Sequence, residues 1–149
     1  MIEPAPEPIL VSACLIGEPV RYNGAHKQVG HAIFQRWQAE GRLIPVCPEV
    51  AGGLPVPRPP AEMVGGAGGA RVLQRLARVV DPQGNDVSEY FLRGAEAAVT
   101  LARLHGIRMA VLKEGSPSCG SGYIYNGSFS GVRVSDRGVT AEALTQLGV

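Results

Sequence analysis

The sequence lacks three features that would assign a protein to a broad class directly. It has no excess of one charge, because 14 lysines and arginines balance 13 acidic residues and the formal net charge is +1. It has no block of Lys or Arg, the usual electrostatic footprint for nucleic acid, so a nucleic-acid partner is not expected. No apolar run approaches the roughly 20 residues that span a bilayer, so no membrane partner is expected either.

A secretory signal and a disulfide framework are also missing. The opening stretch MIEPAPEPILVSACLIG has no positively charged start, and its prolines interrupt any apolar segment, so we expect a cytoplasmic protein. The chain has three cysteines, and an odd number argues against a set of disulfides. In a reducing compartment, cysteines more often bind metal or take part in catalysis.

The features that are present indicate an α/β fold. A chain of 149 residues, 45% of them hydrophobic, suits one domain, 1–149, with its own core. Short β-rich apolar runs bounded by Pro and Gly predict buried strands at 8–14, 42–50 and 107–114. Longer segments with helical spacing of apolar residues predict helices at 31–42, 87–106 and 138–148. Strands that alternate with helices in this way favour a mainly parallel sheet.

Several residues mark where these elements begin and end. Asp86 or Ser88 can cap the long helix at its start, and Gly106 can end it. Thr140 is the expected N-cap of the last helix. The Pro- and Gly-rich segment 52–70 has the composition of a long irregular loop, which in a compact domain is either functional or disordered.

The three cysteines have similar positions along the chain. Cys14 ends the first predicted strand, Cys47 ends the second, and Cys119 lies in the loop after the third. In a parallel sheet the carboxyl ends of all strands lie at one edge, where ligands bind, so these cysteines are expected to converge. Free cysteines are more often small buried hydrophobes, but these three have Pro, Gly and Ser as neighbours, which leaves a thiol accessible.

The spacing leaves three kinds of site open. Three thiolates and an open fourth position can hold a catalytic zinc ion. They can equally hold three irons of a cubane iron–sulfur cluster, with the fourth iron free for substrate. The third alternative is a single nucleophilic cysteine paired with His26, the one histidine in a suitable loop.

Four stretches together resemble a known family. They are ILVSACLIGEPVRYNGAHK, PVCPEVAGGLPVPRPPAE, DVSEYFLRGAE and LKEGSPSCGSGYIYNGSFSG, and in order and spacing they resemble the thiouracil desulfidases, long described as a domain of unknown function. The resemblance implies a Rossmann-like domain with its cofactor at the C-terminal edge of the strands. It also implies a 4Fe–4S cluster held by Cys14, Cys47 and Cys119, which removes sulfur from a small thiolated pyrimidine without redox chemistry and yields uracil and sulfide.

The resemblance, together with position along the chain, suggests roles for five further residues. Glu49, two residues after Cys47, is the expected proton carrier, and Ser116 is expected to bind the substrate or orient the attacking water; a cap and a Ser-Pro turn are their structural alternatives. Asn23, Lys27 and Ser118 are expected near the substrate, with Ser118 donating to a cluster sulfur. Asn23 stands where the family is expected to have Asp, which keeps an oxygen acceptor but loses a charge.

Two other expectations complete the hypothesis. Arg58 and Glu62 are expected to form an ion pair that fixes the Pro- and Gly-rich loop as a wall or lid. The competing functions are desulfuration of a thiouridine in RNA, a zinc-binding or redox-sensing protein without turnover, and a structural interaction domain. Near-zero net charge favours the free base over RNA, because RNA binding normally requires a cationic surface.

Overall fold

A parallel sheet forms the centre of the protein. The computed structural model describes residues 6–25 and 29–149. The strands β1 (Ile9–Ser12), β2 (Leu43–Val46) and β5 (Ala110–Val111) pair in the order β2-β1-β5, and both pairings are parallel. The carboxyl ends of all three strands therefore lie at the same edge, as the sequence predicted.

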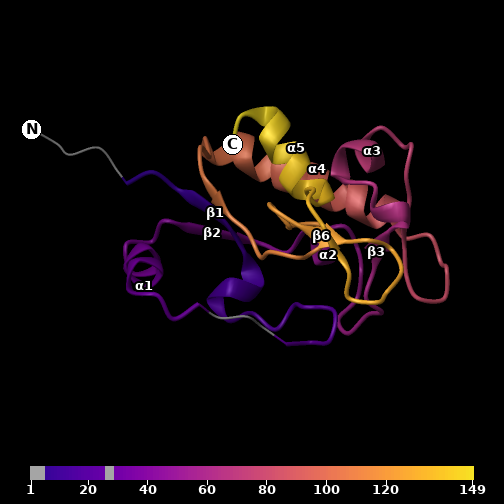
Figure 1. Cartoon of the computed structure of the whole chain (residues 1–149). Helices are drawn as coiled ribbons and strands as arrows, with labels where there is room; N and C mark the ends of the chain where they lie inside the picture. Colours follow the sequence, from indigo (N-terminus) through magenta and orange to yellow (C-terminus); the bar gives the residue numbers. More distant parts are fainter. Residues whose placement is uncertain (1–5, 26–28) are drawn as a thin grey trace, which may run out of the picture.

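Helices cover both faces of this sheet (Figure 1). They are α1 (Ala32–Ala39), α4 (Ser88–His105) and α5 (Val139–Leu147). Side chains of β1 alternate between the faces: Leu10 packs with Ala98 of α4 and Leu144 of α5, whereas Val11 packs with Phe34 of α1. This confirms the predicted α/β fold. None of the helices in the described part of the chain is long and apolar enough to cross a membrane.

A second core joins Phe91 and Ala95 of α4 and Val139 of α5 to Met63, Val72, Val79 and Ile124, which belong to short elements. The short helices are η1 (Ala13–Ile16), α2 (Pro48–Ala51), η2 (Val64–Gly66) and α3 (Gly69–Leu73). Two antiparallel pairs join β3 (Glu62–Met63) to β4 (Val79–Val80) and β6 (Ile124–Tyr125) to β7 (Arg133–Val134). The prediction of a wholly irregular segment at 52–70 is therefore wrong, since strands of two residues are too short to show periodicity.

The C-terminal end of α4 follows the prediction, whereas the predicted cap by Asp86 or Ser88 is wrong, because the N-cap is Val87 and no side chain caps the helix. Gly106 closes the helix in the left-handed conformation with φ 63°. At its start, a carboxylate oxygen of Asp86 accepts a hydrogen bond of 2.9 Å from the N–H of Ser88. The hydroxyl of Ser88 does not cap the helix, because it accepts a hydrogen bond of 2.8 Å from the N–H of Val79 and so ties α4 to β4.

The N-terminus of α5 differs from the prediction. Its N-cap is Gly138, and Thr140 is fully buried in the first turn. The N–H groups of Thr140 and Ala141 donate to the carbonyl of Ser118, at 2.9 and 3.0 Å, and that of Val139 donates to the preceding carbonyl of the same loop. A threonine cap is unnecessary because the loop that carries Cys119 supplies the acceptors. Helix α5 therefore holds this loop in place.

Helix α2, which follows Cys47 directly, rests on α4 without a side chain between them. A Cβ atom added at Gly94 would lie 2.1 Å from the carbonyl oxygen of Pro48. A Cβ atom at Gly52 would lie 1.9 Å from the carbonyl oxygen of Tyr90. These two glycines therefore allow the close backbone contact that fixes where α2 and the neighbouring cysteine stand.

Candidate active site

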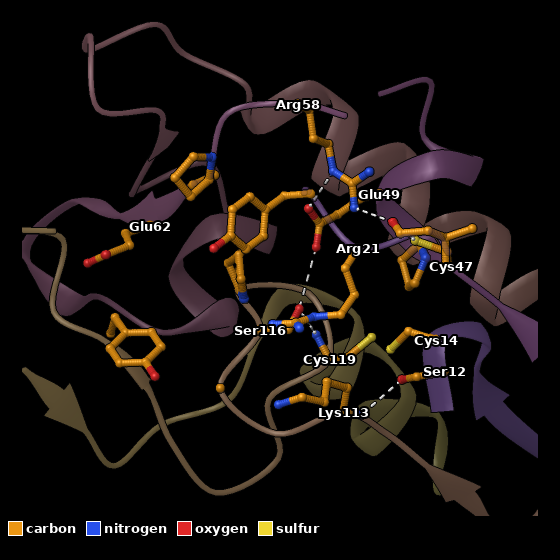
Figure 2. A pocket seen from close by; sticks show the side chains of 18 of the residues that line it. Ser12, Cys14, Arg21, Cys47, Glu49, Arg58, Glu62, Lys113, Ser116 and Cys119 are labelled. Atoms are coloured by element: carbon orange, nitrogen blue, oxygen red, sulfur yellow. Dashed lines mark hydrogen bonds and ion pairs between the residues drawn. The ribbon is translucent and has the colours of Figure 1, made fainter. Parts of the chain in front are cut away.

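A cavity of about 550 Å³ lies at the carboxyl edge of the parallel sheet (Figure 2). Its wall is assembled from segments that follow each of the three parallel strands. The chemically active residues among them are Ser12, Cys14, Cys47, Glu49, Ser116 and Cys119. The convergence expected from a parallel sheet is thus present in the structure.

The three cysteines line this cavity as free thiols. Cys14 and Cys119 are buried, and Cys47 is half-buried. Burial raises the pKa of all three thiols, and the pKa of Cys119 reaches about 12. The charge of Cys47 further raises the pKa of Cys14, as expected for thiols that face one another. A thiol in such a setting loses its proton readily only when a cation takes its place.

The three thiols of this cavity are candidate ligands for a metal group. No three His, Cys, Asp or Glu side chains within residues 6–25 and 29–149 come together as ligands for a single metal ion. The three cysteines nevertheless share one cavity wall. Three sulfur donors on one wall suit a metal group that prefers thiolate ligands.

Positive charge surrounds the thiols. Arg21 and Lys113 both line the cavity, and both lower the pKa of Cys14 against the larger effect of burial. The ammonium group of Lys113 also donates a hydrogen bond of 2.6 Å to the carbonyl of Glu114. These cations favour an anionic ligand set in the cavity. No sequence motif singled out Arg21.

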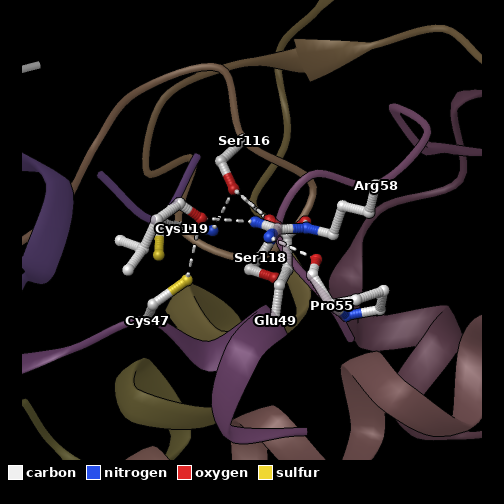
Figure 3. Close-up of polar contacts among 8 residues, drawn as sticks. Cys47, Glu49, Pro55, Arg58, Ser116, Ser118 and Cys119 are labelled. Carbon is white, nitrogen blue, oxygen red and sulfur yellow. Dashed lines mark hydrogen bonds and ion pairs between the residues drawn. The ribbon is translucent and has the colours of Figure 1, made fainter. Parts of the chain in front are cut away.

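The hydroxyl of Ser116 organises the cysteine loop (Figure 3). Its oxygen accepts hydrogen bonds from the N–H groups of Ser118 and Cys119, at 3.0 and 3.1 Å. Its proton is directed at Oε2 of Glu49, 3.5 Å away. A hydroxyl offers one donor and two acceptor positions, so these contacts occupy all of them. Ser116 therefore forms the turn that was its alternative structural role, and it also donates a hydrogen bond to Glu49.

A carboxylate that the sequence analysis missed fixes the other end of this loop. Oε1 of Glu114 accepts hydrogen bonds from the N–H groups of Ser121, Gly122 and Tyr123, at 2.8, 2.9 and 3.1 Å, and Oε2 accepts one of 3.0 Å from the Ser121 hydroxyl. Burial opposes ionisation, but these donors outweigh it and lower the pKa of Glu114 to about 2. In the sequence, Glu114 stands directly before a Gly- and Ser-rich run, and this position could have indicated that its carboxylate binds the N–H groups of the loop.

We expect the Glu114→Gln variant to unfold more easily than the wild type by about 1–3 kcal/mol at pH 7, because an amide accepts these hydrogen bonds less strongly. The folded-state pKa lies below the ordinary 4.5, so the stabilisation is complete above pH 4.5 and disappears as the pH falls to about 2. Urea unfolding of both proteins between pH 7 and pH 3 measures the difference.

The matched control is Glu7→Gln, which removes an exposed carboxylate paired with Arg108 and should change the free energy of unfolding by less than about 1 kcal/mol. A Glu114→Gln variant as stable as this control at pH 7 would show that the carboxylate does not hold the loop.

The predicted ion pair between Arg58 and Glu62 is wrong. The guanidinium of Arg58 pairs with Glu49, with Nε 3.1 Å from Oε1. Glu62 instead accepts hydrogen bonds from the N–H groups of Gly127 and Phe129, at 2.9 and 3.2 Å. The two residues are four apart, but the segment between them is not helical, so their side chains diverge. Both still line the cavity.

Two predicted substrate-binding residues, Asn23 and Ser118, do not line the cavity. Asn23 is exposed, and its side-chain oxygen accepts a hydrogen bond of 3.0 Å from the N–H of Ala25, a turn that Asp would form as well. Ser118 is fully buried, and its hydroxyl has no hydrogen-bond partner in the described part of the chain. Neither residue lines the cavity. Lys27 and His26 lie outside the described residues.

Comparison with known proteins identifies the family. Residues 9–149 match the model of the 2-thiouracil desulfurase family, and the chain therefore belongs to this family. It is 44% identical over 140 residues to the uncharacterized protein YbbK of Bacillus subtilis (strain 168), a match that covers 94% of this chain and 91% of that protein. It is similar to the solved structure of the 4Fe–4S-dependent thiouracil desulfidase TudS, with a TM-score of 0.87, 50% identity, and coverage of 97% of this chain and 88% of that one.

Proposed function

We propose that this protein is a thiouracil desulfidase. It hydrolyses the carbon–sulfur bond of a small thiolated pyrimidine, so that thiouracil and water give uracil and hydrogen sulfide with no change of oxidation state. The observation that carries the proposal is the convergence of Cys14, Cys47 and Cys119 on one cavity, with the carboxylate of Glu49 in the same wall. The half-identical desulfidase TudS supports it.

The donor set fits a 4Fe–4S cluster better than a single zinc ion. Sulfur ligands of a tetrahedral zinc lie about 3.8 Å apart, because Zn–S bonds are about 2.3 Å long. The thiols of Cys14, Cys47 and Cys119 do not gather as a single-ion site. We therefore propose that these three residues would hold the cluster. When bound, the cluster supplies a soft Lewis acid suited to the sulfur of the substrate.

Glu49 is the proposed proton carrier. Its carboxylate reaches the cavity wall, where its side chain is 16% exposed, and both of its oxygens accept hydrogen bonds from protein donors. It takes a proton from the water that attacks the ring carbon bearing sulfur, and it returns the proton to the ring nitrogen or to the departing sulfur. Ser116 supports this step through Glu49, because its hydroxyl has no hydrogen-bonding position left for substrate.

The remaining cavity wall suits a free base. The aromatic residues Tyr22, Tyr125 and Phe129 line the cavity and offer apolar faces for a planar pyrimidine ring. Arg21 and Lys113 add positive charge beside the thiols, which favours the anionic forms of the substrate sulfur and of the hydrosulfide product. A free base is proposed rather than RNA because the net charge of the chain is only +1. We propose the cytoplasm, a reducing compartment, as its location.

Anaerobic incubation with 2-thiouracil tests the function. The cluster-loaded protein should convert the thiocarbonyl absorbance to that of uracil and release one sulfide for each uracil formed. An iron-loaded protein that leaves both 2-thiouracil and 4-thiouracil unchanged would contradict the proposal. Salt-sensitive binding of RNA with desulfuration of its thiouridine, but not of the free base, would support the RNA alternative instead.

A further inference from the structure

The guanidinium of Arg58 is buried in the cavity wall and joins three segments of the chain (Figure 3). Its side chain is 3% exposed. Nε donates to Oε1 of Glu49 at 3.1 Å, Nη1 to the carbonyl of Pro55 at 3.1 Å, and Nη2 to the carbonyl of Val20 at 2.9 Å. Its backbone N–H donates to the carbonyl of Tyr22 at 2.7 Å. Arg58 therefore connects α2 to the loop that follows η1.

Only a guanidinium satisfies this set of acceptors. Its donors lie in one rigid plane and point in different directions, whereas a lysine ammonium is compact and ends a flexible chain. A buried charge also needs an opposite charge beside it. Within the described part of the chain, Glu49 is the carboxylate that pairs with Arg58.

The carboxylate of Glu49 is held from both sides. Figure 2 shows Arg58, Glu49 and Ser116 in a row joined by dashed lines next to the cysteines. Arg58 binds Oε1, and the hydroxyl of Ser116 is 3.5 Å from Oε2. The Ser116 hydroxyl also accepts the N–H of Cys119, so the row connects the carboxylate to the loop of a proposed cluster ligand. Two independent segments thus fix the orientation of this carboxylate.

We infer that Arg58 is the positioning residue of Glu49. It holds the carboxylate toward the cavity in the orientation that accepts a proton from water, and it acts through Glu49 without contacting the substrate. The role of Glu49 as proton carrier rests on the proposed function. Its placement by Arg58 does not, because it is a property of the protein without substrate.

The kinetic test compares Arg58→Lys and Arg58→Ala with a matched control. We expect both variants to keep wild-type iron and sulfide content and a KM within about twofold, and to lose about 100-fold in kcat, because a small displacement of a catalytic group is enough for such a loss. Added guanidinium ion should restore kcat of Arg58→Ala by about tenfold, since truncation leaves room for it. Arg36→Lys changes an exposed arginine with the same Nε–Oε1 contact, 2.8 Å from Glu40, and should keep full activity.

Crystal structures of the same variants without substrate give a second, activity-independent result. We expect Glu49 to leave Ser116 in Arg58→Ala, and a carboxylate that stays in place would overturn the inference. Wild-type kcat in a cluster-loaded Arg58→Lys variant would also overturn it, as would a loss of kcat that only follows lost iron. A cluster-loaded wild type without desulfidase activity would contradict the proposed function, while the crystal structures would still decide the role of Arg58.

Discussion

Replacement of Glu49 by glutamine is expected to lower kcat for thiouracil about 1,000-fold and to leave the iron content unchanged. Positioned general acid–base groups typically contribute 10²–10⁴-fold to a rate, and an amide cannot take up the proton. Glutamine keeps the shape of the side chain and one oxygen that can accept from Arg58, whose Nε is 3.1 Å from the present carboxylate. Sulfide release by iron-matched samples of both proteins measures the effect.

Glu62→Gln is the control for Glu49→Gln. Glu62 is a second carboxylate of the same cavity wall, and it accepts two backbone N–H groups through one oxygen that an amide can replace. We expect its kcat to change less than about fivefold, since it carries no proton in the proposed reaction. Equal rates for Glu49→Gln and the wild type would remove Glu49 from the chemistry. Equal losses in the two variants would point to the charge of the cavity instead.

Replacement of Cys119 by serine is expected to abolish cluster binding. Cys119 is buried at the sheet edge, and its loop is fixed by Ser116 and by the start of α5, so no other thiol can move into its place. Serine is a hard oxygen ligand, whereas iron–sulfur clusters select thiolates. After anaerobic reconstitution we expect less than about one tenth of the wild-type iron per chain and no visible absorbance from a cluster.

Ser118→Ala is the matched control, one residue away. The hydroxyl of Ser118 is fully buried, and Ser118 is not part of the cavity wall, so this variant should keep its iron. Normal iron content in Cys119→Ser would remove Cys119 from the ligand set. Loss of iron in Ser118→Ala would favour the contact with a cluster sulfur that the sequence suggested for this serine.

The main features of the fold and the convergence of the cysteines could be predicted from the sequence. The apolar runs that end near Cys14 and Cys47 are bounded by Pro and Gly, and alternation of strands with helices implies a parallel sheet. Parallel topology then brings loops distant in sequence to one edge, which the pairing of β1 with β2 and β5 confirms. Gly106 as the end of α4 follows from local backbone preference alone.

Partner choice in the loops could not be predicted, because it depends on tertiary contacts. Thr140 has the composition of an N-cap, but carbonyls of the Cys119 loop already bind the first N–H groups of α5. Arg58 and Glu62 are close in sequence, but Arg58 pairs with Glu49 across the cavity wall. Asn23 belongs to a conspicuous motif and forms a turn outside the cavity.

The content of iron, zinc and acid-labile sulfide in anaerobically purified protein shows directly whether the three cysteines hold an iron–sulfur cluster. We expect a brown protein with about four irons and four sulfides per chain, bound at the site of Cys14, Cys47 and Cys119. One zinc ion per chain and no labile sulfide would contradict it.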